Sequence, residues 1–212
     1  MQLSAQSIYD LCTETKVYDI GHRVRLIDPR TGDPLPMISP FVAQRTVVNG
    51  KSYGLSSASY DIRIGHDLVL GPHPGYLTAE GLEESRAYPA SHALHHTTGK
   101  LKGMPPAFAL AHTLEDFAIP KNIAAYVCDK STYARQGVSC FNTLFDPGFI
   151  GNGTLELVNL SAKVIVIRAG DPICQLVFHM LDEATDRPYE GKYQYQPREA
   201  VGPILEGTIE AA

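Results

Sequence analysis

The chain lacks the features that would place it in a membrane or on a nucleic acid. No apolar run approaches the roughly 18 residues needed to span a bilayer, and no basic region followed by an apolar stretch opens the sequence, so we expect no signal peptide. The formal charge of −5 argues against general nucleic-acid binding. With 44% hydrophobic and 19% charged residues, the composition is that of a soluble globular protein, and we expect it to be cytoplasmic.

Several common catalytic motifs are also missing. The chain contains no His-x-Glu and no Cys-x-x-Cys, which zinc-dependent nucleobase deaminases require, and neither a GxxxxGK[ST] nor a GxGxxG loop. The four cysteines are scattered and are expected to be reduced, buried packing residues. His92, His95 and His96 cluster without evident further ligands. Any nucleotide chemistry should therefore proceed without catalytic zinc and without a P-loop.

The pattern of apolar residues predicts one all-β domain over residues 1–212, with few helices. Ser4–Thr15 is expected to form an amphipathic N-terminal helix, and Leu82–Arg86 a turn of helix. Residues 71–104 should form an insertion or long loop, and residues 182–212 a C-terminal arm. Short strands separated by turns indicate a β barrel or sandwich; they are expected at Ala107–Thr113, Asn122–Cys128, Gly137–Phe145, Thr154–Asn159, Ala162–Arg168 and Ile173–Met180.

Two segments carry candidate chemistry. Lys130–Arg135 (KSTYAR) gathers hydroxyl and cationic donors, and a helical turn there would place Ser131 and Arg135 on one face, suited to phosphate oxygens. In the strand Thr154–Asn159, Thr154 and Glu156 share one face while Leu155 points the other way. Glu156 is then either a solvent-facing strand residue or a general base whose pKa is raised by a confined site. The Lys130–Arg135 segment taken alone is equally typical of a capped surface helix.

Two further segments contain polar groups with an ordinary structural explanation beside the functional one. Asp146-Pro147-Gly148-Phe149 is typical of a turn, and its Asp and Phe could also hold a sugar hydroxyl and a sugar face. Tyr189 and residues 192–196 (KYQYQ) could close over a phosphate chain or form a disordered terminus.

Taken in order, these segments resemble the dCTP deaminases of the dUTPase-like superfamily. The likeness includes residues 56–63 (SSASYDIR), residues 108–115 (FALAHTLE) with residues 119–122 (IPKN), the KSTYAR block, the DPGF turn, the TLELVN strand, Gln175 and the terminal KYQYQ. The resemblance implies a distorted jelly-roll barrel of the dUTPase-like type, assembled as a homotrimer with active sites at subunit interfaces. It implies hydrolysis of dCTP to dUTP and ammonia, with the dUTP supplying thymidylate synthesis, and Mg²⁺ bound through the substrate triphosphate.

The resemblance also implies a role for each matching residue. Glu156 would activate the water that attacks C4 of cytosine and would pass protons to the departing amine, with Ser131 and Arg135 positioning water and base. Asp146 would approach the deoxyribose, and Thr154 and Leu155 would line the base pocket. The remaining implied substrate contacts lie in the KSTYAR block and along the later chain, at Lys130, Ser131, Thr132, Tyr133, Ala134, Gln175, Tyr189, Lys192 and Gln196.

Three positions depart from the family pattern, and two alternatives stay open. Asp129 occupies the place of a usual glycine, where a carboxylate about 6 Å from a phosphate would cost on the order of 3 kcal/mol unless it turns away or helps hold Mg²⁺. Gly153 and Tyr195 also replace more usual residues. The first alternative is a dUTPase-type pyrophosphatase, or a bifunctional deaminase and pyrophosphatase, for which Asp146 would serve. The second is a nucleotide-binding regulator that has lost catalysis.

Overall fold

The computed structural model describes residues 1–13, 25–48, 50–70, 86–89, 93–94, 107–161 and 165–204. These residues form a strongly curled β structure with two short helices, α1 (Ala5–Thr13) and α2 (Ser131–Ala134). The all-β prediction, with a short N-terminal helix, is confirmed. The Ser4 hydroxyl accepts the Ser7 N–H at 3.4 Å, as expected of a helix cap. No helix in this part of the chain has the length and apolar character needed to cross a membrane.

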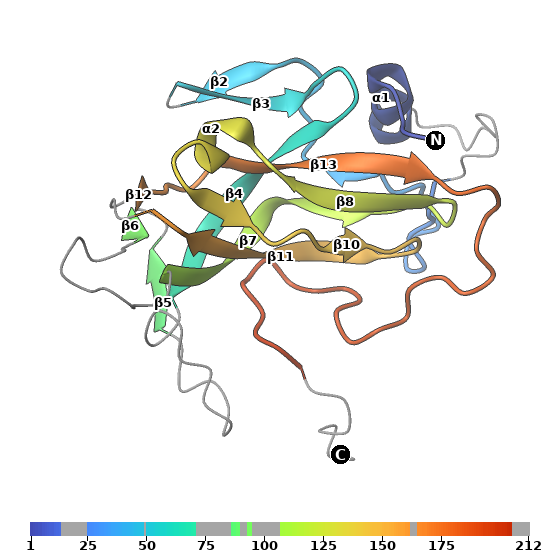
Figure 1. The fold of residues 1–212 in the computed structure, drawn as a ribbon. Coiled ribbons are helices and arrows are strands. Elements are labelled where there is room, and N and C mark those ends of the chain that lie inside the picture. Colours follow the sequence, from blue (N-terminus) through green and yellow to red (C-terminus); the bar gives the residue numbers. More distant parts are fainter. Residues whose placement is uncertain are drawn as a thin grey trace, which may run out of the picture.

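One sheet dominates the molecule (Figure 1). Its main path runs β10-β8-β13-β4-β7-β11-β9, and its neighbouring strands pair antiparallel. The strands of this path are β4 (Tyr60–Leu70), β7 (Ala107–Ala118), β8 (Ile123–Asp129), β9 (Val138–Cys140), β10 (Leu144–Phe145), β11 (Ile150–Asn159) and β13 (Pro172–Met180). Shorter strands flank it: β1 (Ile38–Ser39), β2 (Thr46–Val48), β3 (Lys51–Leu55) and β5 (Arg86–Pro89). A separate pair joins β6 (Ala93–Leu94) to β12 (Ile165–Val166).

The core lies inside the curl of the sheet. Alternate residues of the long strands are fully buried there, including Ile62, Leu155, Leu157 and Leu176. Leu155 and Leu157 therefore face the core, as the alternation predicted, and leave Thr154 and Glu156 on the opposite face. Three cysteines are buried, Cys128 is half-buried, and all four are free.

The expected strands after residue 106 are present with shifted bounds, and one is divided. The predicted strand Gly137–Phe145 is two short strands, β9 and β10. The predicted helical turn Leu82–Arg86 lies outside the described residues except for Arg86, which begins β5. Of the predicted insertion at 71–104, only β5 and β6 are described. The segment after β13 is irregular as far as residue 204 and runs back beneath β10 and β11 (Figure 1).

Candidate active site

Glu156 lies half-buried in β11, opposite Leu110 of β7. One carboxylate oxygen, Oε2, is buried and has no hydrogen-bond partner among the described residues. Burial raises the pKa of Glu156 above its ordinary value, and only a weaker hydrogen bond within the residue itself opposes it. Burying a carboxyl group without a hydrogen-bond partner is costly. Its presence here therefore indicates a group that interacts with a ligand and not one that stabilises the fold.

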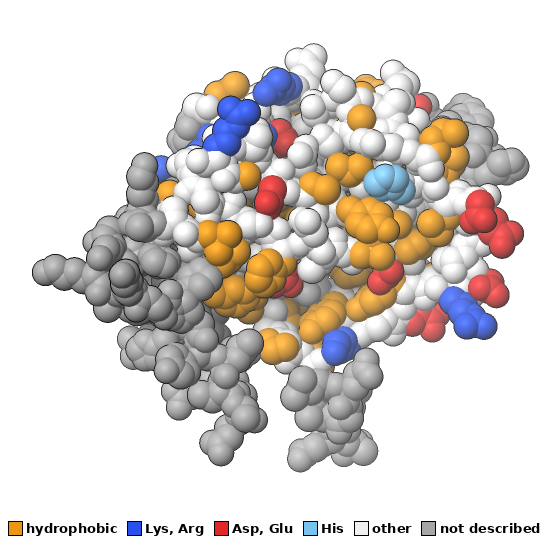
Figure 2. All heavy atoms as spheres, viewed as in Figure 1, with side chains coloured by type: hydrophobic (Ala, Val, Ile, Leu, Met, Phe, Trp, Pro, Cys, Tyr) orange, Lys and Arg blue, Asp and Glu red, His pale blue; other side chains and the backbone are white. Residues whose placement is uncertain are grey.

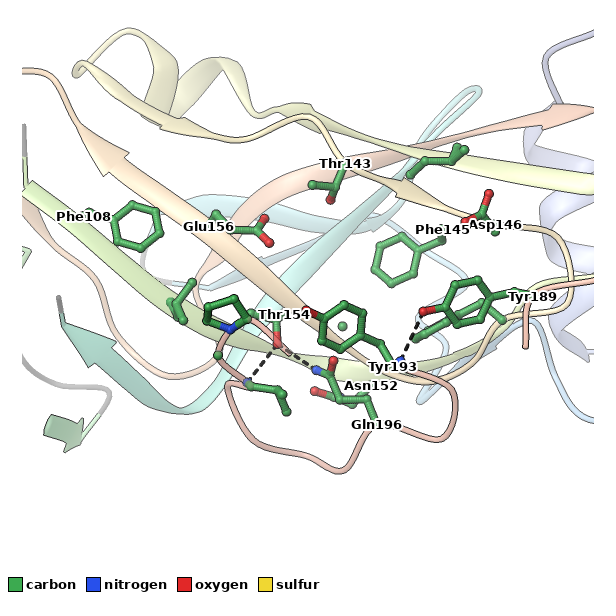
Figure 3. A pocket seen from close by; sticks show the side chains of 17 residues that line it. Phe108, Thr143, Phe145, Asp146, Asn152, Thr154, Glu156, Tyr189, Tyr193 and Gln196 are labelled. Carbon is green, nitrogen blue, oxygen red and sulfur yellow. Dashed lines mark hydrogen bonds between the residues drawn. The ribbon is translucent and has the colours of Figure 1, made fainter. Parts of the chain in front are cut away.

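A cavity of about 550 Å³ opens in front of this carboxylate. That volume lies within the range of small-molecule sites, roughly 300–1,000 Å³. Figure 3 shows the Glu156 side chain lying between Phe108 and Phe145, with its carboxylate directed away from Phe108 and Thr143 close by. The wall is mostly apolar, with a few polar groups; besides these residues it includes Leu110, Leu144, Asp146, Phe149, Asn152, Gly153, Thr154, Tyr189, Tyr193, Gln196 and Val201.

The C-terminal segment closes one side of the cavity through Thr154. The Thr154 hydroxyl accepts hydrogen bonds from Gln196 Nε2 at 2.7 Å and from the Val201 backbone N–H at 3.0 Å (Figure 3). This contact makes Gln196 part of the same cavity wall as Thr154 and Glu156. The structure thus brings together five residues that the sequence assigned to the site: Asp146, Thr154, Glu156, Tyr189 and Gln196.

The DPGF turn forms the far end of the cavity. Gly148 has a φ of +91°, and a Cβ there would lie 2.6 Å from Pro188 Cβ, so the turn requires glycine. Asp146 reaches the cavity from this turn, and Tyr189 lies beside Phe149 with ring centroids 5.7 Å apart. The Tyr189 hydroxyl accepts the Tyr193 N–H at 3.2 Å, which orders the start of the KYQYQ segment.

Lys192 and Leu155, which the sequence also assigned to the site, are not among the residues that line the cavity. The Lys192 ammonium donates to the Ile204 carbonyl and lies 5.5 Å from the centre of the Tyr193 ring. The Leu155 side chain lies in the core on the opposite face of β11, so only its backbone is available to a ligand in the cavity.

The KSTYAR block forms α2 (Figure 1), and none of its residues lines the cavity of its own chain. Arg135 N donates to Ser131 O at 3.1 Å, so the predicted helical turn is present. Ser131, Thr132, Ala134 and Arg135 are exposed. The hydroxyl and guanidinium groups among them have no side-chain partner within the described part of the chain.

The side chains of two other residues of this block are buried in the interior of the protein. Lys130 is 7% exposed, and its ammonium lies 2.5 Å from Asp61 Oδ2 in a buried ion pair. Tyr133 is buried and donates its hydroxyl to Asp171 Oδ2 at 2.9 Å; burial, and secondly the Asp171 carboxylate, raise the pKa of Tyr133. Both side chains hold α2 to the sheet.

Asp129 and Gln175 secure the start of the same block. The Asp129 carboxylate accepts the Ser139 hydroxyl at 2.9 Å and the Cys140 N–H at 2.8 Å, so it turns toward β9. Gln175 donates to the Asp129 carbonyl at 3.1 Å and accepts the Ser59 hydroxyl at 3.1 Å. The cost expected of a carboxylate facing a phosphate therefore does not arise in this arrangement.

Sequence reasoning missed the cavity residues contributed by other strands. Phe108 and Leu110 lie on β7 and Thr143 precedes β10, while Asn152 lies on β11 itself, two positions before Thr154. Only the register of β7 against β11 identifies Leu110 as the neighbour of Glu156. Among the described residues no cluster of three or more His, Cys, Asp or Glu side chains could hold a metal; His92, His95 and His96 lie outside those residues.

The curled sheet and its carboxylate-bearing cavity define a β-structured protein with a site of small-molecule size. A family model described as dCTP deaminase-like matches residues 41–181. A dCTP deaminase of Helicobacter hepaticus is 37% identical over 166 residues, which cover 76% of this chain and 86% of that protein. A dCTP deaminase of Campylobacter hominis is 35% identical over 177 residues, covering 81% and 90%.

A solved structure agrees in fold. The 2'-deoxycytidine 5'-triphosphate deaminase of Agrobacterium tumefaciens superposes with a TM-score of 0.53 and 17% identity, over 84% of this chain. The match covers 47% of that longer chain, so this protein spans about half its length. The chain belongs to the dCTP deaminase-like family.

Proposed function

We propose that this protein hydrolyses dCTP to dUTP and ammonia, with Glu156 as the group that activates water. The observation that carries the proposal is the buried, unpartnered Oε2 of Glu156 at the wall of the cavity. Family membership supports the substrate, since relatives 35–38% identical are named dCTP deaminases.

The proposed chemistry needs one carboxyl group in two protonation states. Ionised Glu156 takes a proton from water as the oxygen attacks C4 of the cytosine ring, which is worth about 10²–10⁴-fold in rate. Protonated Glu156 gives that proton to the ring nitrogen N3. It then takes the remaining proton of the C4 hydroxyl and delivers it to the amine, so that the C4–N bond breaks, ammonia leaves and a C4 carbonyl remains. Burial, which raises the pKa of Glu156, favours this exchange because it brings the two states closer in free energy near neutral pH.

We propose that the complete site is assembled between subunits of a homotrimer. Within one chain, α2 presents Ser131, Thr132 and Arg135 outward and away from the cavity that holds Glu156. Figure 2 shows hydrophobic side chains gathered on the face formed by β8, β10 and β13, where Tyr126 is 45% and Leu144 42% exposed. Such a face is typical of a surface covered by another subunit.

Magnesium would enter with the substrate. The described residues offer no cluster of acidic or histidine ligands, so triphosphate oxygens would have to supply most ligands of a bound Mg²⁺. Bound there, the ion would neutralise phosphate charge. Arg135 and Lys192 would balance the charge that remains, and Ser131 and Thr132 would donate hydrogen bonds to phosphate oxygens.

The test is an assay of all products. Purified protein is incubated with dCTP, dCMP or dUTP plus Mg²⁺, and ammonia, dUTP, dUMP and pyrophosphate are measured. Ammonia from dCTP that disappears in Glu156→Gln, while dCTP binding persists, is the expected result. Pyrophosphate from dUTP without ammonia from dCTP would indicate a pyrophosphatase instead, and binding without turnover a regulator.

Shared sites have their own test. Glu156→Gln and Arg135→Ala chains are each expected to be inactive. Mixed after dissociation and reassembly, they should regain part of the wild-type rate, because some interfaces then combine an intact Glu156 with an intact Arg135. Mixtures that stay as inactive as the separate variants would contradict the shared site.

A further inference from the structure

Two consecutive irregularities in strand pairing interrupt the sheet at β7, one against β11, which carries Glu156, and one against β4. Between β7 and β11 the register changes after Asn152, so that Gly153 alone faces residues 113–115 of β7. Between β4 and β7 it changes again, and His112 alone faces residues 65–67 of β4. Such bulges free backbone N–H and C=O groups from the ladder. When those groups are buried they need new partners.

Asn152 and Thr113 satisfy the first irregularity. Asn152 Nδ2 donates to the carbonyls of Thr113 at 2.7 Å and Glu115 at 3.0 Å. The Thr113 hydroxyl donates to the Glu115 carbonyl at 2.7 Å and accepts the Gly153 N–H at 2.9 Å. Both side chains are fully buried, so an unmade bond here would cost about 1–3 kcal/mol.

His112 joins the two irregularities. Its Nε2 accepts the His66 backbone N–H at 2.9 Å, which places the ring proton on Nδ1. Nδ1 then lies 3.0 Å from the Thr113 carbonyl and 3.2 Å from Asn152 Oδ1. The ring fills the space over Gly65, where a Cβ would lie 2.0 Å from His112 Cε1. Only glycine at position 65 leaves room for this imidazole.

This network determines which residue lies beside Glu156. If the register of Ile150–Asn152 continued unchanged, Glu156 would stand opposite His112. The irregularity moves it along β7 to stand opposite Leu110. Because the offset is even, the carboxylate keeps its face of the strand, but an apolar neighbour replaces a polar one.

The same network reaches the C-terminal segment. The Asn152 backbone N–H donates to the Gln196 carbonyl at 3.0 Å, and Gln196 in turn donates to Thr154. Asn152 and Thr154 stand on either side of Gly153, where the register changes (Figure 3).

We infer that His112, Thr113 and Asn152 are positioning residues for the deamination: they hold the register that sets Glu156 against Leu110 at the cavity wall. The inference rests on the proposed function for the reaction, while its geometric part concerns Glu156 alone. None of the three side chains needs to touch the substrate for this role.

The test compares two substitutions at Thr113. Thr113→Val removes the hydroxyl at nearly constant volume, and Thr113→Ser keeps it. Thr113→Val is expected to lower kcat about 10- to 100-fold, the scale of a misplaced catalytic group, with KM changed less than about threefold. Thr113→Ser should keep most of the wild-type kcat. Tyr60→Phe is the control, since it removes buried hydrogen bonds to Val42 N and Pro40 O outside the cavity.

A second readout needs no turnover. The carboxyl carbon signal of Glu156, assigned by its loss in Glu156→Gln, is titrated by NMR in each variant. The pKa of Glu156 should fall toward its ordinary value in Thr113→Val, because the carboxylate leaves its apolar neighbour, and should stay raised in Thr113→Ser and Tyr60→Phe. None of these variants substitutes the other titratable residues that line the cavity, Asp146, Tyr189 and Tyr193.

The outcomes separate the inference from the proposed function. Thr113→Val with wild-type kcat and Glu156 pKa, but a Tm lowered like that of Tyr60→Phe, would overturn the positioning role, as would a Thr113→Ser variant equally damaged. If Thr113→Val does not fold, His112→Gln, which keeps a donor and an acceptor, is compared with His112→Leu in the same way. Wild-type protein that releases no ammonia from dCTP would refute the proposed function, and the titration would still decide the positioning role.

Discussion

The buried ion pair between Lys130 and Asp61 leads to a prediction that distinguishes support from substrate binding. Their side chains are each 9% exposed, with Nζ and Oδ2 2.5 Å apart. The resemblance to dCTP deaminases implies that Lys130 contacts phosphates, whereas the structure directs its ammonium inward. Lys130→Met should therefore act mainly on the free energy of unfolding.

The expected size follows from the burial of the pair. Removing one partner leaves an uncompensated buried charge, which costs about 3–5 kcal/mol. Lys130→Met and Asp61→Asn should each lose roughly that much, a large part of the stability of about 5–15 kcal/mol typical of a domain. The double variant should lose about 1–3 kcal/mol less than the sum, because neither charge is then left alone.

The assay is urea unfolding at fixed protein concentration. The chain contains no tryptophan, so far-ultraviolet circular dichroism of the β structure is the suitable signal. KM for dCTP is measured in parallel on the same preparations. If Lys130→Met kept the wild-type urea midpoint and raised KM tenfold or more, Lys130 would be a phosphate ligand and this reasoning would be wrong.

Three further changes have directions fixed by the structure. Burial raises the pKa of Glu156 above its ordinary value of 4.5, so its contribution to stability is complete below the ordinary pKa and is lost as pH rises through the folded value. Glu156→Gln should therefore gain stability relative to wild type as pH rises above the ordinary pKa, measured by urea midpoints, and a pH-independent difference would contradict the shift. Tyr195 has a φ of +61°, so Tyr195→Gly should stabilise the protein by up to about 1 kcal/mol, whereas a clear loss of Tm would show that the exposed ring is needed. Asp129→Ala should cost about 1–3 kcal/mol by freeing the Cys140 N–H and the Ser139 hydroxyl, and Ser139→Ala, which leaves the Cys140 bond intact, should cost less in the same denaturation assay.

Sequence reasoning found the strands whose pattern of apolar residues can be recognised within the strand itself. β7, β8, β11 and β13 alternate or run apolar over seven or more residues, so their existence can be predicted without knowing their partners. β4 was not predicted, although it is equally long. Its charged residues Asp61 and Arg63 suggest a loop when the local sequence is read alone. They are compatible with a strand because they form ion pairs with Lys130 and Glu115, which lie 69 and 52 positions away in the sequence.

The residues of the candidate site likewise fall into two groups, those that the local sequence predicts and those that depend on distant strands. Glu156 and Thr154 could be assigned to one face from alternation alone, and the DPGF turn from its turn chemistry. The residues beside the carboxylate could not, because they depend on the register of β7, and a bulge of two residues changes that register without any local sequence signal. Asp129 is a similar case, since its partners Ser139 and Cys140 become visible only when β9 is placed.

The division of polar groups within α2 supports the proposal that the site is shared between subunits. Inward-facing Lys130 and Tyr133 fasten the helix to Asp61 and Asp171, and Asp129 fastens its start to β9. A four-residue helix is too short to be stable by itself, so these bonds hold the backbone that carries Ser131 and Arg135. The outward donors are thereby held in place before any ligand arrives, which would reduce the entropy lost if they bind a phosphate as proposed. Among the described residues no Lys or Arg side chain lines the cavity of Glu156, so under the proposed function the cationic groups for a triphosphate would have to come from outside that lining.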